Sequence, residues 1–348
     1  MIRCRSRLLL ACLLVLPPAV SADRHPGASW DKAASVEKLG WSVAKLTEAR
    51  EYSRSIDSAA VMIVQDGLVV DEWGEPARKF NLHSIRKSIL SALYGIHMKE
   101  GRIRLHRTLE QLRIDDNEPA LTPVERKATV HDLLKARSGI YHPALYETPS
   151  MKAARPPRGI HPPGAFWYYN NWDFNALGAI FEQETNTRIF EEVKRRLAEP
   201  LQMEDYQVED GQYVRGADSI HPAYPIRMTA RDLARFGLLY LRQGKWRGRE
   251  IVPKNWVRDS VRSYSDAGEA GGYGYMWWVA AGGRHFPGVT LKDGSYSGRG
   301  AGGHFVVVIP DHKLVVVHRV NTDQPTRGVT SAQFGRLLAL ILEAKTRR

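Results

Sequence analysis

The hydrophobic and polar positions of the chain predict strands near both ends and helices between them. Two apolar, β-rich runs, 59–64 and 68–73, flank Asp66-Gly67, and this arrangement is typical of a β-hairpin. Further strand-like runs occur late in the chain, at 273–279, 304–309 and 314–320. The last two are joined by a Pro-Asp-His turn, which predicts a second hairpin.

Between these runs, apolar residues recur at helical spacing, whereas the proline- and glycine-rich stretch 143–166 is expected to be a loop. Helices are predicted at 43–55, from about 84 onward, and at 130–135, 172–184, 189–197, 233–242 and 331–344. Strands at both ends with helices between them favour one α/β (α+β) domain over residues 23–348. Its α/β part is expected at about 41–83 and 246–348, and a mostly helical part at about 84–245.

The first residues that suggest chemistry are Ser84 and Lys87, at the start of the helix predicted from 84. Residues three apart share a helix face, so the Lys87 amine is expected beside the Ser84 hydroxyl. A serine becomes a good nucleophile when a neighbouring base accepts its proton, and lysine can be that base if its pKa is lowered. The alternative is an N-cap serine next to a solvated lysine.

Residues 1–22 have the pattern of a secretory signal peptide: a basic start, an apolar run and the small residues Val20-Ser21-Ala22. The apolar run is too short to be a transmembrane helix. A Leu-Leu-Ala-Cys sequence at 9–12 lies too early in this run for a lipoprotein signal, so lipid anchoring is not expected. We therefore expect a periplasmic or secreted protein without an integral membrane segment in its mature form.

Composition narrows the function classes further. Both cysteines, Cys4 and Cys12, lie in the signal segment, so the mature chain would have no thiol nucleophile or thiolate metal site. The net charge is +12, but the basic residues are dispersed. The main basic run, 194–196, follows two glutamates in a predicted helix, which favours a solvated face over nucleic-acid binding.

Two later motifs complete a pattern that begins with Ser84-x-x-Lys87. They are Tyr169-Asn170-Asn171 and Tyr296-Ser297-Gly298-Arg299. In this order the three motifs resemble those of the serine β-lactamase and penicillin-recognising superfamily, in particular its class C-like branch, which also contains esterases and D-amino-acid peptidases. The resemblance extends over about residues 43–343 and includes Leu-Leu-Lys-Ala-Arg-Ser-Gly at 133–139.

The resemblance implies a β-lactamase/transpeptidase-like fold, with an antiparallel sheet flanked by the N- and C-terminal helices and an inserted helical part. It also implies roles for individual residues. Ser84 would be the nucleophile, Lys87 its base partner and Tyr169 a proton shuttle, with the phenolate stabilised by the Lys87 cation. Asn171 would organise the substrate, and the backbone N–H groups of Ser84 and Arg299 would form the oxyanion hole.

The third motif departs from the family pattern, because Tyr296 stands where relatives have lysine or histidine, while Ser297 and Gly298 fit. The cation at this position usually meets a substrate carboxylate. We therefore expect substrate binding by Tyr296, Ser297, Gly298 and Arg299 to favour neutral esters or amides. The side chain of Arg299 or Lys292 is the alternative source of the missing charge.

The resulting hypothesis is an exported serine hydrolase that acts on a small ester, amide or peptide substrate through a Ser84 acyl-enzyme. No metal site and no cofactor is expected, and nucleic acid is not an expected partner. One alternative is a β-lactamase or D-alanyl-D-alanine carboxypeptidase; another is a non-catalytic binding protein on the same fold. His83 is expected to be structural or solvated rather than a base, and Tyr168 to be a packed aromatic residue.

Overall fold

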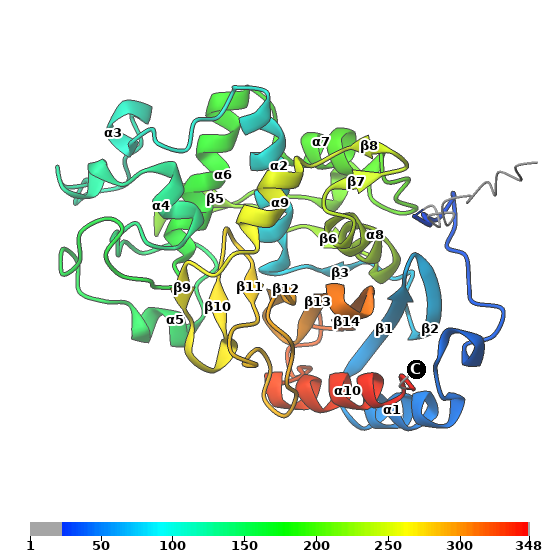
Figure 1. Ribbon diagram of the computed structural model, residues 1–348. Helices are drawn as coiled ribbons and strands as arrows, with labels where there is room; N and C mark the ends of the chain where they lie inside the picture. The colour runs from blue at the N-terminus through cyan, green and yellow to red at the C-terminus, as the bar shows by residue number, and fades with distance from the viewer. Residues whose placement is uncertain (1–22, 347–348) are drawn as a thin grey trace, which may run out of the picture.

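The structure, a computed structural model, describes residues 23–346 (Figure 1). The predicted signal segment, residues 1–22, lies outside the described residues, so its export function remains a prediction. Among the described residues, no helix has both the length and the apolar character needed to cross a membrane.

An eight-stranded sheet forms the centre of the molecule, in the order β2-β1-β14-β13-β12-β11-β10-β9. Its recorded strand pairs are all antiparallel. The strands are β1 Ser58–Gln65, β2 Leu68–Gly74, β9 Ser265–Asp266, β10 Gly272–Tyr273, β11 Trp278–Val279, β12 Tyr296–Gly300, β13 His304–Ile309 and β14 Leu314–Val320. The first and last parts of the chain meet where β1 pairs with β14, which confirms the predicted antiparallel sheet.

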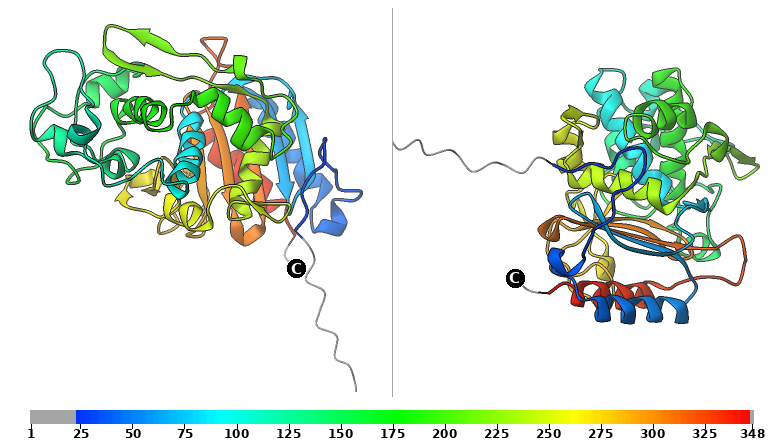
Figure 2. Two further views of the ribbon diagram at one scale, coloured as in Figure 1. Left: turned by 90° about the horizontal axis from the view of Figure 1, so that it is seen from above. Right: turned by 90° about the vertical axis from the view of Figure 1, so that its right-hand side faces the viewer.

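Helices cover both faces of this sheet. The terminal helices α1 (Val43–Ser55) and α10 (Ser331–Glu343) lie side by side on one face (Figures 1 and 2). Helix α8 (Ala230–Leu241) packs on the other face, against β1, β13 and β14. Because strand side chains alternate between faces, neighbouring residues of β14 enter different cores, Val316 beneath α10 and Val315 beneath α8. Helix α8 therefore belongs to the sheet layers, although it falls within the range 84–245 expected to be the helical part.

The helical part stands beside and above the sheet (Figure 2, left). Its helices are α2 Ile85–Lys99, α3 Leu109–Leu112, α4 Val130–Leu134, α5 Pro149–Ala154, α6 Asn171–Thr185 and α7 Ile189–Val193. Helix α9, Lys254–Ser260, also packs on α2, although it falls within the range 246–348 expected to be the α/β part. The described residues also form three small two-stranded sheets. Two are hairpins, β4 Val214–Gly216 with β5 Ser219–Ala223 and β7 Lys245–Trp246 with β8 Arg249–Glu250, and the third joins distant segments, β3 Phe80–Asn81 with β6 Arg227–Met228. This combination of sheet and helices confirms the predicted α/β (α+β) class.

Two local predictions were wrong. The run 273–279 is not one strand, because the chain turns between β10 and β11, where the Gly274 N–H donates to the Trp277 carbonyl at 2.8 Å. A Cβ at Gly274 would lie 2.1 Å from the Ser260 carbonyl oxygen, so only glycine fits this turn. The expected loop 143–166 contains α5, which begins with a Thr148 N-cap and a proline in its first turn.

Candidate active site

Ser84 lies immediately before α2, where β3 leads into the helix. Its hydroxyl makes no capping hydrogen bond to the helix backbone, which excludes the N-cap interpretation and leaves Oγ available for chemistry. The preceding residue, His83, has a positive φ of 46°, and its N–H donates to Asn81 Oδ1 at 2.9 Å. Asn81 thereby holds the unusual backbone turn that presents Ser84.

The amine of Lys87 connects the first two sequence motifs. Lys87 is 1% exposed, and its Nζ lies 2.9 Å from Ser84 Oγ, 2.8 Å from the Tyr169 hydroxyl and 2.8 Å from Asn171 Oδ1. Tyr169 immediately precedes Asn170, the residue that caps α6, so the start of this helix positions both Tyr169 and Asn171. The structure thus brings together the four residues predicted from these two motifs.

The protonation states of this group differ from the expectation of a tyrosinate. Burial, helped by the Arg86 charge, holds the pKa of Lys87 well below its usual value. Burial also raises the pKa of Tyr169 to about 12, although the Ser84 hydrogen bond and the charges of Arg86 and Arg299 act in the opposite direction. Both shifts favour neutral side chains: a free amine at Lys87 and a phenol at Tyr169.

A neutral Lys87 can accept a proton as well as donate. Asn171 Nδ2 donates to the Tyr146 carbonyl at 2.6 Å, so Asn171 Oδ1 is the acceptor that faces Lys87. A neutral amine has two N–H bonds and one lone pair. Three oxygens lie close to the amine, and its two N–H bonds can donate to only two of them. The third contact must therefore be a hydroxyl, Ser84 or Tyr169, that donates to the lone pair. The arrangement is therefore suited to removing a proton from Ser84.

Strand β12 lies against the start of α2. A Cβ at Gly298 would be 3.1 Å from Ser88 Oγ, and a Cβ at Gly300 would be 2.4 Å from the Leu82 carbonyl oxygen. These two glycines permit the close approach. Arg299 lies between them, with its side chain on the other face of the strand.

The backbone of Arg299 is turned toward the open side of β12. Ser295 accepts from Ala280 on the β11 side at 2.8 Å, and the β11 pairing ends at Ser297 opposite Trp278. Because N–H directions alternate along a strand, the Arg299 N–H points the same way, beyond the end of β11. The Arg299 N–H therefore has no partner on β11, and it is available as the second donor, after the Ser84 N–H, of the expected oxyanion hole.

The side chain of Arg299 is held in a fixed position. Its Nε donates to Ser297 Oγ at 3.0 Å, and its Nη2 donates to the His285 carbonyl at 2.7 Å. The guanidinium lies over the rings of Trp278 and Phe286, at 4.9 and 4.2 Å from their centroids. Burial lowers the pKa of Arg299 to about 9, so the group remains a cation at neutral pH. Within residues 23–346, no carboxylate forms an ion pair with it.

These groups open into a cleft of about 790 Å³, whose lining includes Ser84, Tyr169, Asn171, Trp278 and Arg299. Trp278 is stacked on Tyr169 with 5.4 Å between ring centroids, so it is the cleft-facing member of the Trp277-Trp278 pair. The cleft lining also contains Arg86, a cation that the sequence motifs did not single out. The sequence feature that could have pointed to Arg86 is its position next to Lys87.

Three predicted substrate-binding residues do not line the cleft. The Tyr296 ring packs against Trp277 and Tyr240 in the core, because an aromatic side chain is buried there more favourably than a lysine would be. Ser297 bonds with His285 and Arg299 instead and therefore orients Arg299. Gly298 faces α2.

The alternative cation Lys292 also lies elsewhere. It is exposed and forms an ion pair with Asp311 at 2.8 Å. Arg299 is therefore the third-motif residue whose charge reaches the cleft.

A hydrogen-bonded network supports the turn at His83. His83 and His304 both bond with Thr322 Oγ1, at 2.8 and 3.2 Å. Arg319 donates to His304 Nδ1 and to the carbonyls of Phe80 and Asn81, each at 3.0 Å. These hydrogen bonds fit the structural role expected of His83, which also lies in the lining of the cleft described above. The sequence feature that could have pointed to this network is Arg319, a charged residue within the apolar run 314–320.

Tyr168 is held away from the Lys87 amine by its own contacts. The Tyr168 hydroxyl donates to the Met151 carbonyl at 2.8 Å, and its ring packs edge-on against Tyr141, as expected for a packed aromatic residue. Within residues 23–346, no group of three or more histidine, cysteine, aspartate or glutamate side chains is arranged to hold a metal ion.

Known proteins of similar structure share this fold. A protein from Bacillus anthracis assigned as a 6-aminohexanoate-dimer hydrolase has 20% identity and a TM-score of 0.67, covering 94% of this chain and 91% of its own. A β-lactamase from Mycobacterium bovis has 19% identity and a TM-score of 0.61, covering 85% and 99%. A β-lactamase/D-alanine carboxypeptidase from Pseudomonas syringae has 17% identity and a TM-score of 0.62, covering 89% and 99%.

The sequence itself gives a family assignment. No curated protein gave a significant match to the chain. The family model described as Beta-lactamase matches residues 43–340, which includes all three motifs and nearly all of the described chain. The chain therefore belongs to the β-lactamase family of serine hydrolases, on the β-lactamase and penicillin-binding protein fold.

Proposed function

We propose that this protein hydrolyses an ester or amide bond through an acyl-enzyme on Ser84. The observation that carries the proposal is the contact of one buried, pKa-lowered amine, Lys87, with Ser84, Tyr169 and Asn171 at 2.8–2.9 Å. A general base must lie within hydrogen-bond reach of the proton that it removes, and Lys87 does so.

The first half of the reaction forms the acyl-enzyme. Neutral Lys87 accepts the Ser84 proton while Oγ bonds to the substrate carbonyl carbon, and the carbonyl oxygen takes up the negative charge. The N–H groups of Ser84 and Arg299 stabilise this oxyanion. The carbon–leaving-group bond then breaks, the leaving group takes the Tyr169 proton, and Tyr169 receives a proton from Lys87.

The second half releases the acid. Water attacks the acyl carbon and transfers a proton to the Tyr169–Lys87 pair, with the oxyanion again held by the two N–H groups. When the tetrahedral intermediate collapses, the bond to Ser84 Oγ breaks and Ser84 regains its proton from the same pair. The enzyme returns to its starting state, and one water has been consumed.

The charge of the cleft changes the expected substrate preference. Arg86 and Arg299 line the cleft, and neither forms an ion pair with a carboxylate of the described residues. Glu147 also lines it, but this carboxylate is paired with Arg155. The preference for neutral substrates rested on the missing cation at Tyr296. With Arg299 in the cleft wall, we propose instead that substrates carrying an anionic group near the scissile bond are favoured.

This charge gives weight to the second candidate activity, that of a β-lactamase or D-alanyl-D-alanine carboxypeptidase, because both substrate types carry a carboxylate. A turnover panel of short neutral esters, a chromogenic cephalosporin and a D-Ala-D-Ala peptide tests the proposal, with Ser84→Ala as control. Turnover of at least one ester or amide is expected in the wild type and none in the control. A non-catalytic binding protein would turn over none of them.

The variant Arg299→Gln tests the substrate preference. A hydrogen bond to a charged group contributes about 1.5–3 kcal/mol, so kcat/KM for the anionic substrates should fall about 10- to 150-fold. The value for the neutral ester should change little. An equal loss for both substrate types would contradict the role of the Arg299 charge.

We also propose export to the periplasm or beyond, on the basis of the signal-like pattern of residues 1–22. N-terminal sequencing of the mature protein should then begin at or near Asp23. A mature chain that still begins at Met1 would contradict export through this segment.

A further inference from the structure

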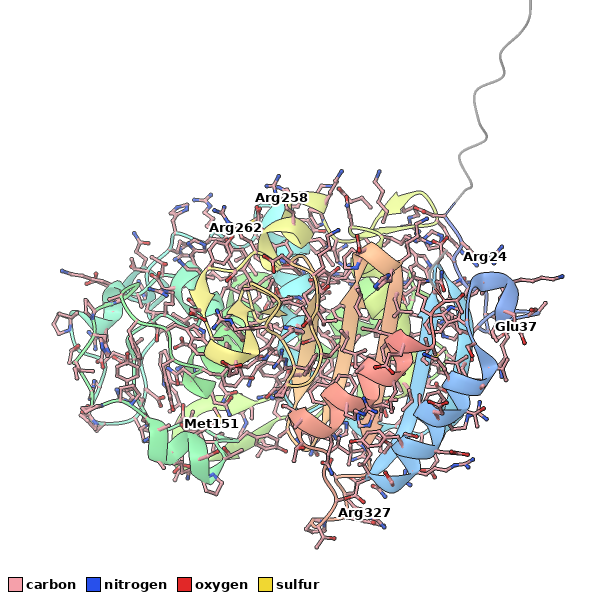
Figure 3. The ribbon with its side chains drawn as sticks, turned by 60° about the horizontal axis from the view of Figure 1, so that its bottom comes forward. Arg24, Glu37, Met151, Arg258, Arg262 and Arg327 are labelled. Carbon is pink, nitrogen blue, oxygen red and sulfur yellow. The ribbon has the colours of Figure 1, made fainter. Side chains whose placement is uncertain are left out.

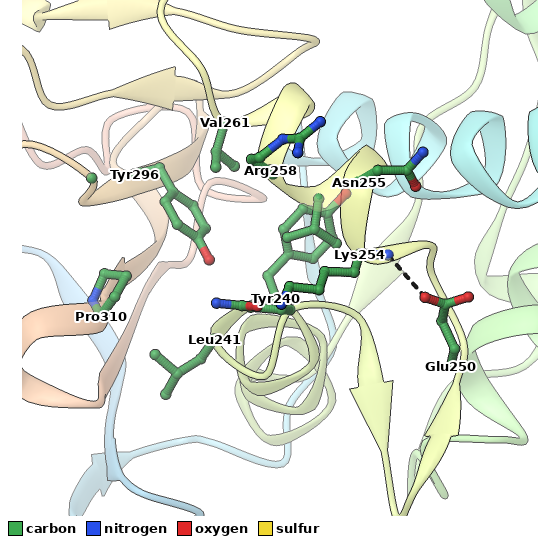
Figure 4. A pocket seen from close by; sticks show the side chains of 12 residues that line it. Tyr240, Leu241, Glu250, Lys254, Asn255, Arg258, Val261, Tyr296 and Pro310 are labelled. Atoms are coloured by element: carbon green, nitrogen blue, oxygen red, sulfur yellow. Dashed lines mark hydrogen bonds between the residues drawn. The ribbon is translucent and has the colours of Figure 1, made fainter.

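A second cavity lies on the side of Tyr296 that faces away from the catalytic cleft. It has a volume of about 630 Å³ and is bounded by the end of α8, by α9 and by the beginning of β12 (Figure 4). None of the residues that line it lines the catalytic cleft. Its volume lies within the range of ordinary small-molecule sites.

The inner wall of this cavity is apolar and aromatic. The rings of Tyr240 and Tyr296 form its floor, and Leu241, Val257, Val261 and Pro310 contribute aliphatic surface. Figure 4 shows the Tyr296 hydroxyl pointing into the cavity. This hydroxyl makes no hydrogen bond to another residue within 23–346, so it is free to bond with a ligand. The wall fits a flat or branched apolar group with a polar edge.

The rim of the cavity is positively charged. Lys254 and Arg258 lie exposed on α9, and Figure 3 shows Arg258 at the outer surface of the molecule. The Lys254 amine has no ion-pair partner within residues 23–346. Glu250 is the carboxylate in the lining, but it pairs with Lys99 and accepts from the Lys254 backbone N–H at 3.1 Å. Arg258 Nε pairs with the neighbouring Asp259 at 2.8 Å. The Lys254 amine is therefore the rim cation that no carboxylate of residues 23–346 pairs with, and its charge favours an anion.

From the apolar floor and the cationic rim, we propose that this cavity is a second binding site, for a small amphipathic carboxylate with an aryl or branched-alkyl body. The body lies on the floor formed by the Tyr240 and Tyr296 rings, and the carboxylate lies at Lys254 and Arg258. Burial of the apolar body supplies most of the affinity, and the cations select an acid over its neutral analogue.

The site is also connected to the catalytic centre. Tyr296 and Tyr240 contact Trp277, with 5.3 and 4.5 Å between ring centroids. Trp278, the next residue, is stacked on Tyr169. A ligand on the two tyrosines therefore contacts side chains that pack on Trp277, and the next residue, Trp278, is stacked on Tyr169. An effect of the ligand on turnover rests on the proposed hydrolase function, whereas binding itself does not.

Titration calorimetry with 2-naphthoate tests the site, using full-length mature protein carrying Ser84→Ala so that turnover plays no part. One naphthoate per chain should bind. The double variant Lys254→Gln/Arg258→Gln should weaken binding about two- to thirtyfold, the effect of losing two exposed ion pairs. The matched control Lys292→Gln removes one exposed cation outside the cavity and should leave binding unchanged.

Two further measurements separate this site from the catalytic cleft. Wild-type protein whose Ser84 carries a phosphonate should bind naphthoate with unchanged affinity, and 2-naphthamide should bind more weakly than the acid. Equal binding by the double variant and the Lys292→Gln control would overturn the proposal. Loss of binding on phosphonate modification would do the same, because the probe would then occupy the catalytic cleft.

Discussion

Lys87 is surrounded by protein on all sides, and this environment suits it to the proposed role of a base. Burial makes the ammonium form unfavourable, and the neighbouring Arg86 guanidinium adds repulsion, so the pKa of Lys87 falls well below its ordinary value. Arg86 is itself buried and donates to the His83 carbonyl at 3.1 Å. One residue thus supports the turn before Ser84 and biases the protonation of Lys87.

Arg86→Gln tests this electrostatic role. Removing the positive charge removes a cause that lowers the Lys87 pKa, so this pKa should rise. The free amine then forms only at higher pH, and the acid limb of the kcat/KM–pH profile should shift to higher pH. Arg86→Lys keeps the charge and should leave the limb near its wild-type position. Profiles that do not differ between the two variants would exclude a charge effect of Arg86.

At the scale of elements, the site depends on the close contact between β12 and the start of α2. Gly300→Ala would place a methyl group 2.4 Å from the Leu82 carbonyl oxygen, so one of the two elements must move. Overpacking of this kind costs about 1–3 kcal/mol of stability. It should also lower kcat at least tenfold, because the distance between the Ser84 and Arg299 N–H groups changes.

The control for this change is Gly328→Ala, where an added Cβ would meet only one atom, at 4.0 Å. Thermal unfolding and turnover of an ester substrate measure both effects. If Gly300→Ala behaved like the Gly328→Ala control, β12 and α2 would not be in the close contact described.

Elements defined by local pattern were predictable from the sequence, and those defined by distant contacts were not. The hairpin around Asp66-Gly67 and the helix after Ser84 followed from turn residues and apolar spacing alone. The break between β10 and β11 depends on the approach of Gly274 to the Ser260 carbonyl, which no local pattern reveals. The order of the motifs pointed to Ser84, Lys87 and Tyr169 as the candidate catalytic residues.

The directions in which the Tyr296 and Arg299 side chains point could not be predicted from the sequence. They depend on which face of β12 meets α2 and α8, and therefore on how the helices pack on the sheet. The motif placed both residues in the site, but only the structure shows that Arg299 reaches the cleft while Tyr296 packs in the core. The expected substrate charge changed for this reason.

At the scale of the whole molecule, buried histidines tie stability to pH. His318 is fully buried between Ser58 and the Gly303 carbonyl, and burial lowers its pKa to about 4. The unfolded chain binds this proton below about pH 6.5, whereas the folded chain does so only near pH 4. The contribution of His318 is therefore complete above pH 6.5 and is lost as the pH falls toward 4.

The expected loss from His318 alone is about 2 kcal/mol at pH 5 relative to pH 7. His318→Gln removes the titrating group while keeping an amide that can hydrogen-bond. Urea unfolding at pH 7 and pH 5 should show a smaller drop in unfolding free energy for this variant than for the wild type. The same drop in both proteins would mean that His318 is not protonated on unfolding in this range.

The central claim is that Ser84 is a nucleophile activated by Lys87, and covalent labelling tests it most directly. Intact-mass spectrometry after treatment with an aryl phosphonate should show one adduct on the wild type, and peptide mapping should place it on Ser84. Ser84→Ala should gain no adduct, and Lys87→Ala should be labelled about 10²- to 10⁴-fold more slowly, the usual contribution of a general base. A wild type that stays unlabelled, or a Lys87→Ala variant labelled as fast as the wild type, would contradict the account.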